Sequence, residues 1–298
     1  MNSASHLLMV RPAGFGFNPE TAVNNAFQVA EPGNVQERAL SEFDRMVQLL
    51  NHHHIEVTIV NDMPSPETPD SIFPNNWVSF HEGGIMCLYP MFAPIRRLEK
   101  KPELIEFLQR KFNVSAILDL SPHENENRFL EGTGSMVLDR RHKIAYACLS
   151  PRTHIEVLEE FCCLMKYKPI PFHGEDKNRI PVYHTNVMMT VGNEYAVICL
   201  DSIADTQEKD QVVTSLRNSE KEIIPITHHQ MQHFAGNMLE VFNKDGKSFV
   251  IMSTQAYQSL NTGQITTLQK YSAILHTPLY TIEANGGGSA RCMITEVF

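Results

Sequence analysis

Five short turns recur along the chain at nearly equal intervals, and each opens an apolar segment of alternating polarity. The turns begin at positions 75, 132, 184, 235 and 287, which are 51 to 57 residues apart. Their sequences are NNWVSF, GTGSMVL, HTNVMMTV, AGNMLEVF and GGSARCMITEVF. A fixed period of this length is typical of repeat architectures, in which each repeat is one supersecondary unit. The repeat therefore constrains the fold more than any other feature of the sequence.

Within each interval the same order of elements is predicted: a hairpin, an amphipathic helix and a further strand. After the second turn, 135–138 and 144–148 form the hairpin, 153–166 the helix and 169–172 the last strand. The corresponding predictions elsewhere are hairpins at 77–80 with 85–89, 187–191 with 195–200 and 238–242 with 249–252, helices at 97–111, 205–218 and 255–272, and strands at 115–118, 222–226 and 279–282.

The last turn is followed by a single strand, and the missing pieces of its unit lie near the N-terminus. A strand at 7–10, a helix at 36–52 and a strand at 55–60 complete the fifth unit. A ring whose last unit is shared between both chain ends leaves no open sheet edge at the seam. We therefore predict an α/β fold, a five-bladed propeller of ββαβ modules with pseudo-fivefold symmetry. Residues 1–298 form its single domain.

The sequence lacks the features of a nucleic-acid-binding or membrane protein. It carries a net charge of −9 and no block of Lys or Arg, which argues against binding to a phosphate backbone. No segment approaches the roughly 18 apolar residues of a membrane span, and the first residues lack the basic stretch of a signal peptide. The six cysteines have no CxxC spacing, which is typical of reduced thiols. We therefore expect a cytoplasmic protein, and a homodimer is compatible with the sequence.

The five turns carry polar side chains that meet at one central opening if the ring closes. A thiol beside an imidazole is the minimum for covalent thiol catalysis, because the imidazole moves the proton. A carboxylate beside them accepts hydrogen bonds from N–H groups of a substrate. Three glycines precede the cysteine and let the backbone approach a small molecule closely. The side chains are Asn75, Asn76, Glu131, His184, Asn237 and Cys292.

These turns resemble, over almost the whole chain, those of the guanidine-modifying or pentein superfamily of arginine deiminases, dimethylargininases and amidinotransferases. The resemblance implies a five-bladed ββαβ propeller. It also implies that Cys292, after the glycine run, is the nucleophile. His184 at the start of the third module is then the general acid and base, and Glu131 in the EGT turn is the third catalytic residue.

Further motifs imply how a substrate is held. DSIFPNNW resembles a dimethylargininase stretch in which two Asp residues lie six apart, and Asp70 and Asn76 occupy those positions beside Asn75. YPMFAPIRRLE resembles a P-x-R-R-x-E turn. The resemblance implies that the first Arg of this turn, here Arg96, meets the α-carboxylate end of the substrate. CLSPRT makes Arg152 the second carboxylate-binding Arg. The planar guanidinium suits this role because it binds a carboxylate through two parallel hydrogen bonds.

The chain departs from arginine deiminases at two positions, where these enzymes typically carry Asp and this sequence has Asn76 and Asn186. A guanidinium offers only donors, whereas a ureido group offers donors and an acceptor, so amides complement a ureido group better. The pattern is similar to citrulline utilization hydrolases, and succinylarginine dihydrolases also use Asn here. We therefore predict hydrolysis of citrulline to ornithine, ammonia and CO₂ through a covalent adduct on Cys292. Neither cofactor nor metal is expected.

Several alternatives stay open on the sequence alone. They are an arginine deiminase, a dimethylargininase, an amidinotransferase, and a non-enzymatic propeller like the ribosome anti-association factors. The clusters His52–His54 and 228–233 lack the Glu of a zinc-binding HExxH helix, so a metal site is not predicted at either. Gly14 and Gly16 predict a loop at the mouth of the site or a lid. It is left open whether Arg128 reaches the pocket or pairs with a nearby acid, and whether Asn186 touches the ligand or orients His184.

Overall fold

The computed structural model describes residues 3–298, and these contain five separate three-stranded sheets. In four of these sheets an antiparallel hairpin supplies two strands, and the strand after the helix adds in parallel. The mixed α/β class and the ββαβ order are therefore confirmed. The sheets comprise β3 (Val78–His81), β4 (Ile85–Leu88) and β5 (Ala116–Asp119); β6 (Val137–Asp139), β7 (Ile144–Cys148) and β8 (Lys168–Phe172); β9 (Met189–Val191), β10 (Tyr195–Ile198) and β11 (Glu222–Pro225); β12 (Leu239–Phe242), β13 (Ser248–Ser253) and β14 (Ala273–Thr277); and β15 (Thr295–Val297), β1 (His6–Arg11) and β2 (Glu56–Asn61).

The fifth sheet is assembled from both ends of the described chain. The last strand, β15, pairs antiparallel with β1, with Leu7 opposite Glu296. Strand β1 pairs in parallel with β2, with Leu7 opposite Val57. The predicted contribution of the N-terminal segment to the last unit is thus confirmed at the level of strand pairing.

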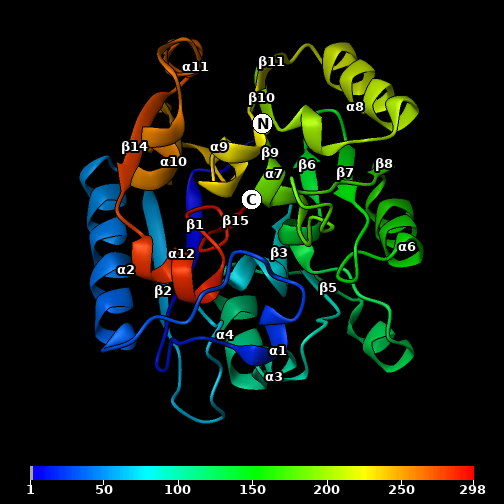
Figure 1. Ribbon diagram of the computed structural model, residues 1–298. Helices are drawn as coiled ribbons and strands as arrows, with labels where there is room; N and C mark the ends of the chain where they lie inside the picture. The colour runs from blue at the N-terminus through cyan, green and yellow to red at the C-terminus, as the bar shows by residue number, and fades with distance from the viewer. Residues whose placement is uncertain (1–2) are drawn as a thin grey trace.

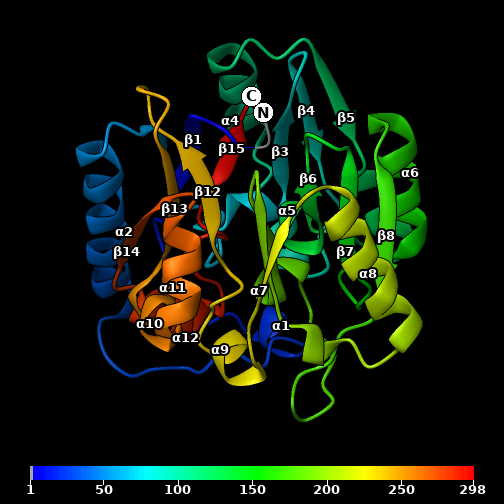
Figure 2. The same cartoon turned by 90° about the horizontal axis from the view of Figure 1, so that it is seen from above.

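The long helices lie on the outside and the hairpins toward the middle of the molecule, as both ribbon views show (Figures 1 and 2). Apolar residues spaced three or four apart give a helix one face that can pack on a sheet. Among the described residues, no helix is both long and apolar enough to cross a membrane. The outer helices are α2 (Val35–His52), α4 (Pro102–Lys111), α6 (Ile155–Met165), α8 (Thr206–Asn218), α10 (Thr254–Ser259) and α11 (Thr262–Gln269).

Short helical turns, not strands, open several units. Turns η1 (Pro74–Asn76), α5 (Gly132–Ser135) and α7 (Thr185–Met188) each precede the first strand of a hairpin. In the structure, the first strands of these three hairpins therefore begin one or two residues later than predicted. These turns point polar side chains inward before the apolar alternation starts. The remaining short helices are α1 (Pro19–Ala22), α3 (Pro94–Arg97), α9 (His228–Gln232), α12 (Tyr280–Gly286), η2 (Ser121–Glu126) and η3 (Leu200–Ser202).

Two predictions for the fourth unit are wrong. The helix expected at 255–272 is divided into α10 and α11, because Asn261 and Gln264 form a reciprocal capping box that starts a new helix. The strand expected at 279–282 is part of a helical segment instead, since α12 begins at Tyr280 and packs against α2. The strand of this unit is β14, which pairs in parallel with β13.

The helix expected at 97–111 is also shorter than predicted. Only its first residue, Arg97, belongs to the separate turn α3, and α4 begins at Pro102. Proline is favoured in the first turn of a helix, where its missing N–H is not needed. Arg96 and Arg97 therefore lie in α3, a separate turn ahead of the outer helix.

Candidate active site

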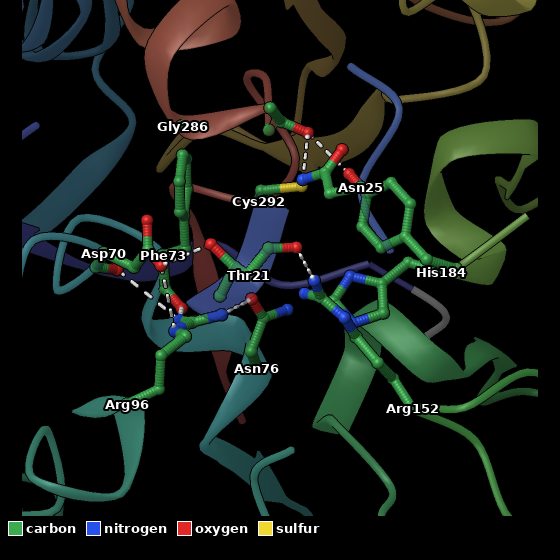
Figure 3. Close-up of a pocket in the computed structure, with 13 residues that line it drawn as sticks. Thr21, Asn25, Asp70, Phe73, Asn76, Arg96, Arg152, His184, Gly286 and Cys292 are labelled. Carbon is green, nitrogen blue, oxygen red and sulfur yellow. Dashed lines mark hydrogen bonds and ion pairs between the residues drawn. The ribbon is translucent and has the colours of Figure 1, made fainter. Parts of the chain in front are cut away.

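A small cavity of about 270 Å³ lies where the unit-opening turns meet (Figure 3). It brings together six of the nine site residues predicted from the sequence. Of the other three, Glu131 contacts His184, Asn186 contacts Cys292, and Asn75 contacts Asn76. The predicted residues that line the cavity are Asp70, Asn76, Arg96, Arg152, His184 and Cys292.

His184 and Glu131 form a buried pair. The His184 Nε2 lies 2.7 Å from Glu131 Oε2, and Glu131 Oε1 accepts a hydrogen bond from the Phe92 N–H at 2.9 Å. Burial opposes ionisation of Glu131, but Arg152 and His184 outweigh it and hold the pKa of Glu131 well below its usual range. An ionised carboxylate only accepts hydrogen bonds, so Nε2 carries the proton and Nδ1 is left as an acceptor. Burial lowers the pKa of His184 to about 4, which keeps the ring neutral near pH 7.

Glycines let the turns approach one another closely. A Cβ at Gly134 would lie 2.4 Å from Asn76 Nδ2 and 2.8 Å from His184 Nδ1, closer than real Cβ contacts allow. Gly132 has a φ of +48°, and a Cβ built on it would lie 2.3 Å from the Asn75 carbonyl oxygen. The GTG sequence is therefore required for the imidazole and the amide of Asn76 to share one cavity.

Cys292 is buried and its sulfur is contacted by two amides. Asn237 Nδ2 lies 3.2 Å from Sγ, and Asn186 Nδ2 lies 3.6 Å from it. The Cys292 N–H donates to the Ser289 carbonyl at 2.9 Å, which fixes the turn after the glycine run. Burial raises the pKa of the Cys292 thiol, with the Ser289 backbone and the amides opposing this shift only partly. The thiol is therefore protonated in the free protein near neutral pH.

Asp70 is buried at the opposite side of the cavity. Its Oδ2 accepts hydrogen bonds from Asn18 Nδ2 at 2.7 Å and from the Thr21 hydroxyl at 3.3 Å. Its Oδ1 has no hydrogen-bond partner within residues 3–298. Burial raises the pKa of Asp70, while Arg96 favours its charged form. A buried, unpaired carboxylate oxygen on the cavity wall is a ready acceptor for a ligand donor.

Arg96 is already engaged by protein groups. It forms a two-point contact with Glu99, at 2.8 Å from Nε and 3.0 Å from Nη2, and its Nη1 donates to Asn76 Oδ1 at 2.7 Å. Burial raises the pKa of Glu99 to about 7, although Arg96 opposes this shift. The guanidinium edge that the sequence motif assigned to a substrate carboxylate thus faces Glu99, and Arg96 orients Asn76.

Arg152 connects the cavity to the N-terminal segment. Its Nε donates to Asn24 Oδ1 at 2.8 Å, its Nη2 donates to the Thr21 carbonyl at 2.6 Å, and its Nη1 lies 3.5 Å from Glu131. The guanidinium also lies 5.0 Å from the centre of the Tyr183 ring, within the range of a cation–π contact. Arg152 therefore fixes the segment around α1 over the catalytic pair.

Several lining residues escaped sequence reasoning, namely Thr21, Asn25, Phe73 and Tyr183. The glycines at 14 and 16 indicated only a loop at the mouth, and nothing in the local sequence marked which side chains turn inward. The structure also shows whether Arg128 reaches the cavity. Arg128 forms an exposed ion pair with Glu126 and does not line the cavity.

The chain is similar to known proteins over almost its whole length. A model of the family "N,N dimethylarginine dimethylhydrolase, eukaryotic" matches residues 11–298, and no curated protein matches the chain. The substrate-bound N-terminal domain of ArgZ, an arginine dihydrolase from the ornithine-ammonia cycle in Cyanobacteria, is 17% identical with a TM-score of 0.76 and 98% of each chain covered. Unliganded AgrE is 20% identical with a TM-score of 0.75, over 98% of this chain and 39% of AgrE. A dimethylarginine dimethylaminohydrolase in an adduct with S-methyl-L-thiocitrulline is 15% identical with a TM-score of 0.68, over 98% of this chain and 99% of that one.

The similarities to solved structures are all at low sequence identity and support the fold alone. The family model, which matches residues 11–298, assigns the chain to a family. The chain spans only 39% of full-length ArgZ but 98% of its N-terminal domain. The chain therefore belongs to the N,N dimethylarginine dimethylhydrolase family, a family of hydrolases within the pentein superfamily.

Proposed function

We propose that residues 1–298 form one catalytic domain, with its five sheets closed into a pseudo-fivefold ring, and that it hydrolyses the ureido group of citrulline. The products are ornithine, ammonia and CO₂. One observation carries the proposal: the side chain of Asn76 is oriented so that its nitrogen, not its oxygen, is left for a ligand. The following contacts support it.

Asn76 Oδ1 accepts a hydrogen bond from Arg96, which has only donors, so the orientation of the amide is fixed. Its Nδ2 donates one hydrogen to Asn75 Oδ1 at 3.1 Å, which leaves the second hydrogen as a donor. In Figure 3 the oxygen of Asn76 faces Arg96 and its nitrogen lies on the side of His184. A ureido oxygen accepts this hydrogen bond, whereas a guanidinium has no acceptor to offer.

The amino-acid end of citrulline matches the far side of the cavity. The unpaired Oδ1 of Asp70 accepts a hydrogen bond from the substrate's α-ammonium group. Arg152 is the proposed contact for the α-carboxylate, because it lines the cavity and carries a permanent charge. Arg96 acts instead on the head group, through Asn76. The charged amino-acid end of the substrate is thus held by charged side chains, and its neutral ureido group by an amide.

Chemistry starts from a neutral thiol and a neutral imidazole. His184 Nδ1 takes the Cys292 proton as Sγ adds to the ureido carbon, and Glu131 stabilises the imidazolium that forms. The imidazolium then returns the proton to the departing nitrogen as a C–N bond breaks, leaving the carbonyl carbon bound to sulfur. Water activated by His184 adds to this carbon, the C–S bond breaks, and the thiol is regained. One water is consumed, and the resulting carbamic acid or its equivalent yields CO₂ and the remaining amine.

A second candidate is an arginine dihydrolase, in which the same cysteine hydrolyses the guanidinium and then the ureido group. It is favoured by the similarity to the substrate-bound ArgZ domain over 98% of both chains. The buried carboxylates Asp70 and Glu131 also give a cationic head group some compensation. The citrulline step is common to both candidates.

The deciding experiment supplies citrulline, arginine or N,N-dimethylarginine labelled with ¹³C at the reacting carbon and identifies products by mass spectrometry. The proposal expects labelled CO₂ from citrulline. Labelled CO₂ from arginine as well supports the dihydrolase. Accumulation of labelled citrulline from arginine, with no further breakdown, would contradict both and show a deiminase. The Cys292→Ala variant is the control for activity from contaminating enzymes.

A further inference from the structure

The Cys292 sulfur lies between two amide side chains from different units of the repeat. Asn237 comes from the turn before β12, and Asn186 comes from α7. We propose that Asn237 and Asn186 form a neutral thiolate-binding site, whose amide donors hold the sulfur in its ionised form when its proton passes to His184. This inference rests on the proposed role of Cys292 as the nucleophile. It gives Asn186 a role different from the substrate contact expected from the sequence.

The orientation of Asn237 is fixed by its other partners. Its Oδ1 accepts a hydrogen bond from the Arg291 N–H at 3.0 Å, so the oxygen cannot face the sulfur. One hydrogen of Nδ2 bonds the Asn186 carbonyl at 2.8 Å, and the other points to Sγ at 3.2 Å. Each polar atom of this amide is thereby assigned, and a donor necessarily faces the sulfur.

Asn186 can serve both forms of the sulfur. Its Nδ2 lies 3.6 Å from Sγ and donates to a thiolate, whereas its Oδ1 lies 3.9 Å from Sγ and accepts from a thiol. Within residues 3–298 its side chain has no other hydrogen bond recorded. An Asp at this position would offer only acceptors and a negative charge, and would favour the thiol. The amide thus permits ionisation that a carboxylate would oppose.

The nearest cation does not contact the sulfur. Arg291 precedes the cysteine, but its Nη1 donates to the Ile294 carbonyl at 2.8 Å and its Nη2 to Glu296 at 3.1 Å. Its charge favours the thiolate only through space. Arg291 does not line the cavity, and the charged or titratable groups that line it beside Cys292 are Asp70, Arg96, Arg152, Tyr183 and His184.

Close backbone packing places the two amides together. A Cβ at Gly236 would lie 2.4 Å from the Val187 carbonyl oxygen, so only glycine fits there. The Asn that follows this glycine is therefore brought beside Asn186 by the approach of two turns. The AGN sequence thus resembles GTG near His184, because in both a glycine allows two turns to pack closely and so brings polar side chains together.

The test measures the rate at which iodoacetamide alkylates Cys292 between pH 6 and 10, with the modified peptide quantified by mass spectrometry. Asn186→Asp and Asn237→Asp should each raise the apparent pKa of alkylation by at least about one unit. At pH 8 this lowers the rate about tenfold or more, because each unit is a tenfold change in thiolate. Asn243→Asp, in the turn between β12 and β13, is the matched control and should leave the rate unchanged.

The outcomes separate this inference from the proposed function. An unchanged apparent pKa in Asn186→Asp, with a wild-type unfolding midpoint, would overturn the inference even if citrulline is hydrolysed. A raised apparent pKa would support it even if citrulline is not the substrate. If Asn237→Asp does not fold, Asn186→Asp decides, because its side chain bonds to the sulfur and not to the backbone network.

Discussion

Two groups of buried polar residues, in the cavity lining and directly behind it, solve the problem of burying polar groups in opposite ways. One group, which we call the charged wall, is made of ionisable residues that neutralise one another. The other, which we call the amide wall, consists of neutral amide side chains, two of which contact the Cys292 sulfur. The charged wall comprises Asp70, Arg96, Glu99, Glu131 and Arg152. The amide wall comprises Asn76, Asn186 and Asn237.

The difference shows where charge is useful to this site. Buried ions are tolerated only when paired, and the charged wall meets this condition while leaving Asp70 Oδ1 free. Fixed charge next to the nucleophile would favour one protonation state throughout the cycle. Amides donate or accept as required, so the sulfur can gain and lose its proton at each step. The predictions below test this division of roles.

The largest expected effect is on the nucleophile. Cys292→Ala should lower turnover by about 10³-fold or more, because the covalent step is lost. The fold should persist, since the change removes a single buried atom. Initial rates with citrulline and circular dichroism measure the two properties. Cys163→Ala, at an exposed cysteine, serves as the control and should change neither. Near-normal turnover in Cys292→Ala would place the nucleophile elsewhere.

Breaking the charged wall should affect both stability and activity. Glu131→Gln leaves Arg152 and His184 without their buried counter-charge, so we expect a loss of about 3–5 kcal/mol in the free energy of unfolding. Turnover should fall about 100-fold or more, because the imidazolium is no longer stabilised. Denaturant titration and kcat measure these changes. Glu126→Gln removes an exposed partner of Arg128 and should alter stability by no more than about 0.5 kcal/mol.

Stability should also depend on pH through His184. Its pKa is about 4 in the folded protein and 6.5 in the absence of burial, so the unfolded chain binds more protons between these values. The contribution of His184 to stability is therefore complete above pH 6.5 and is lost as the pH drops toward 4. Denaturant midpoints measured from pH 4 to 8 should show this slope. The slope should be smaller in His184→Gln, and equal slopes in the two proteins would contradict the prediction.

Adding charge to the amide wall should change substrate preference. Asn76→Asp replaces the donor that faces the head group by an acceptor, so the ratio of kcat/KM for arginine over that for citrulline should rise. We expect a change of about ten- to a hundredfold, the effect of one mismatched polar contact. Competition between the two substrates gives the ratio directly. A ratio that falls would mean that Asn76 does not contact the head group.

The smallest effect is expected outside both walls. Arg128→Ala removes an exposed ion pair, which contributes about 1 kcal/mol at most. KM and kcat for citrulline should be unchanged, since Arg128 does not line the cavity. Steady-state kinetics check this. A several-fold rise in KM would show that Arg128 reaches the substrate after all.

Sequence reasoning succeeded where a pattern repeats and failed where a local signal competes with packing. The strands at 144–148 and 169–172 were placed within one residue, because alternating apolar residues are diagnostic of half-buried strands. The apolar stretch at 279–282 was wrongly assigned to a strand, since burial in a helix against α2 gives a similar composition. The residues predicted on the repeated turns lie in the cavity lining or contact residues that do, whereas the lining residues Thr21 and Tyr183 were not predicted because no repeat marks them.

The sequence by itself determined the order of elements in each unit and which side chains are candidates for the chemistry. Both are local properties, written in periodicity, glycine spacing and residue chemistry. Only the tertiary structure decided which groups these side chains meet: Arg96 faces Glu99, Asn186 faces the sulfur, and Asp70 keeps one oxygen unpaired. Such contacts join residues up to 106 positions apart, and their geometry depends on how closely whole units pack.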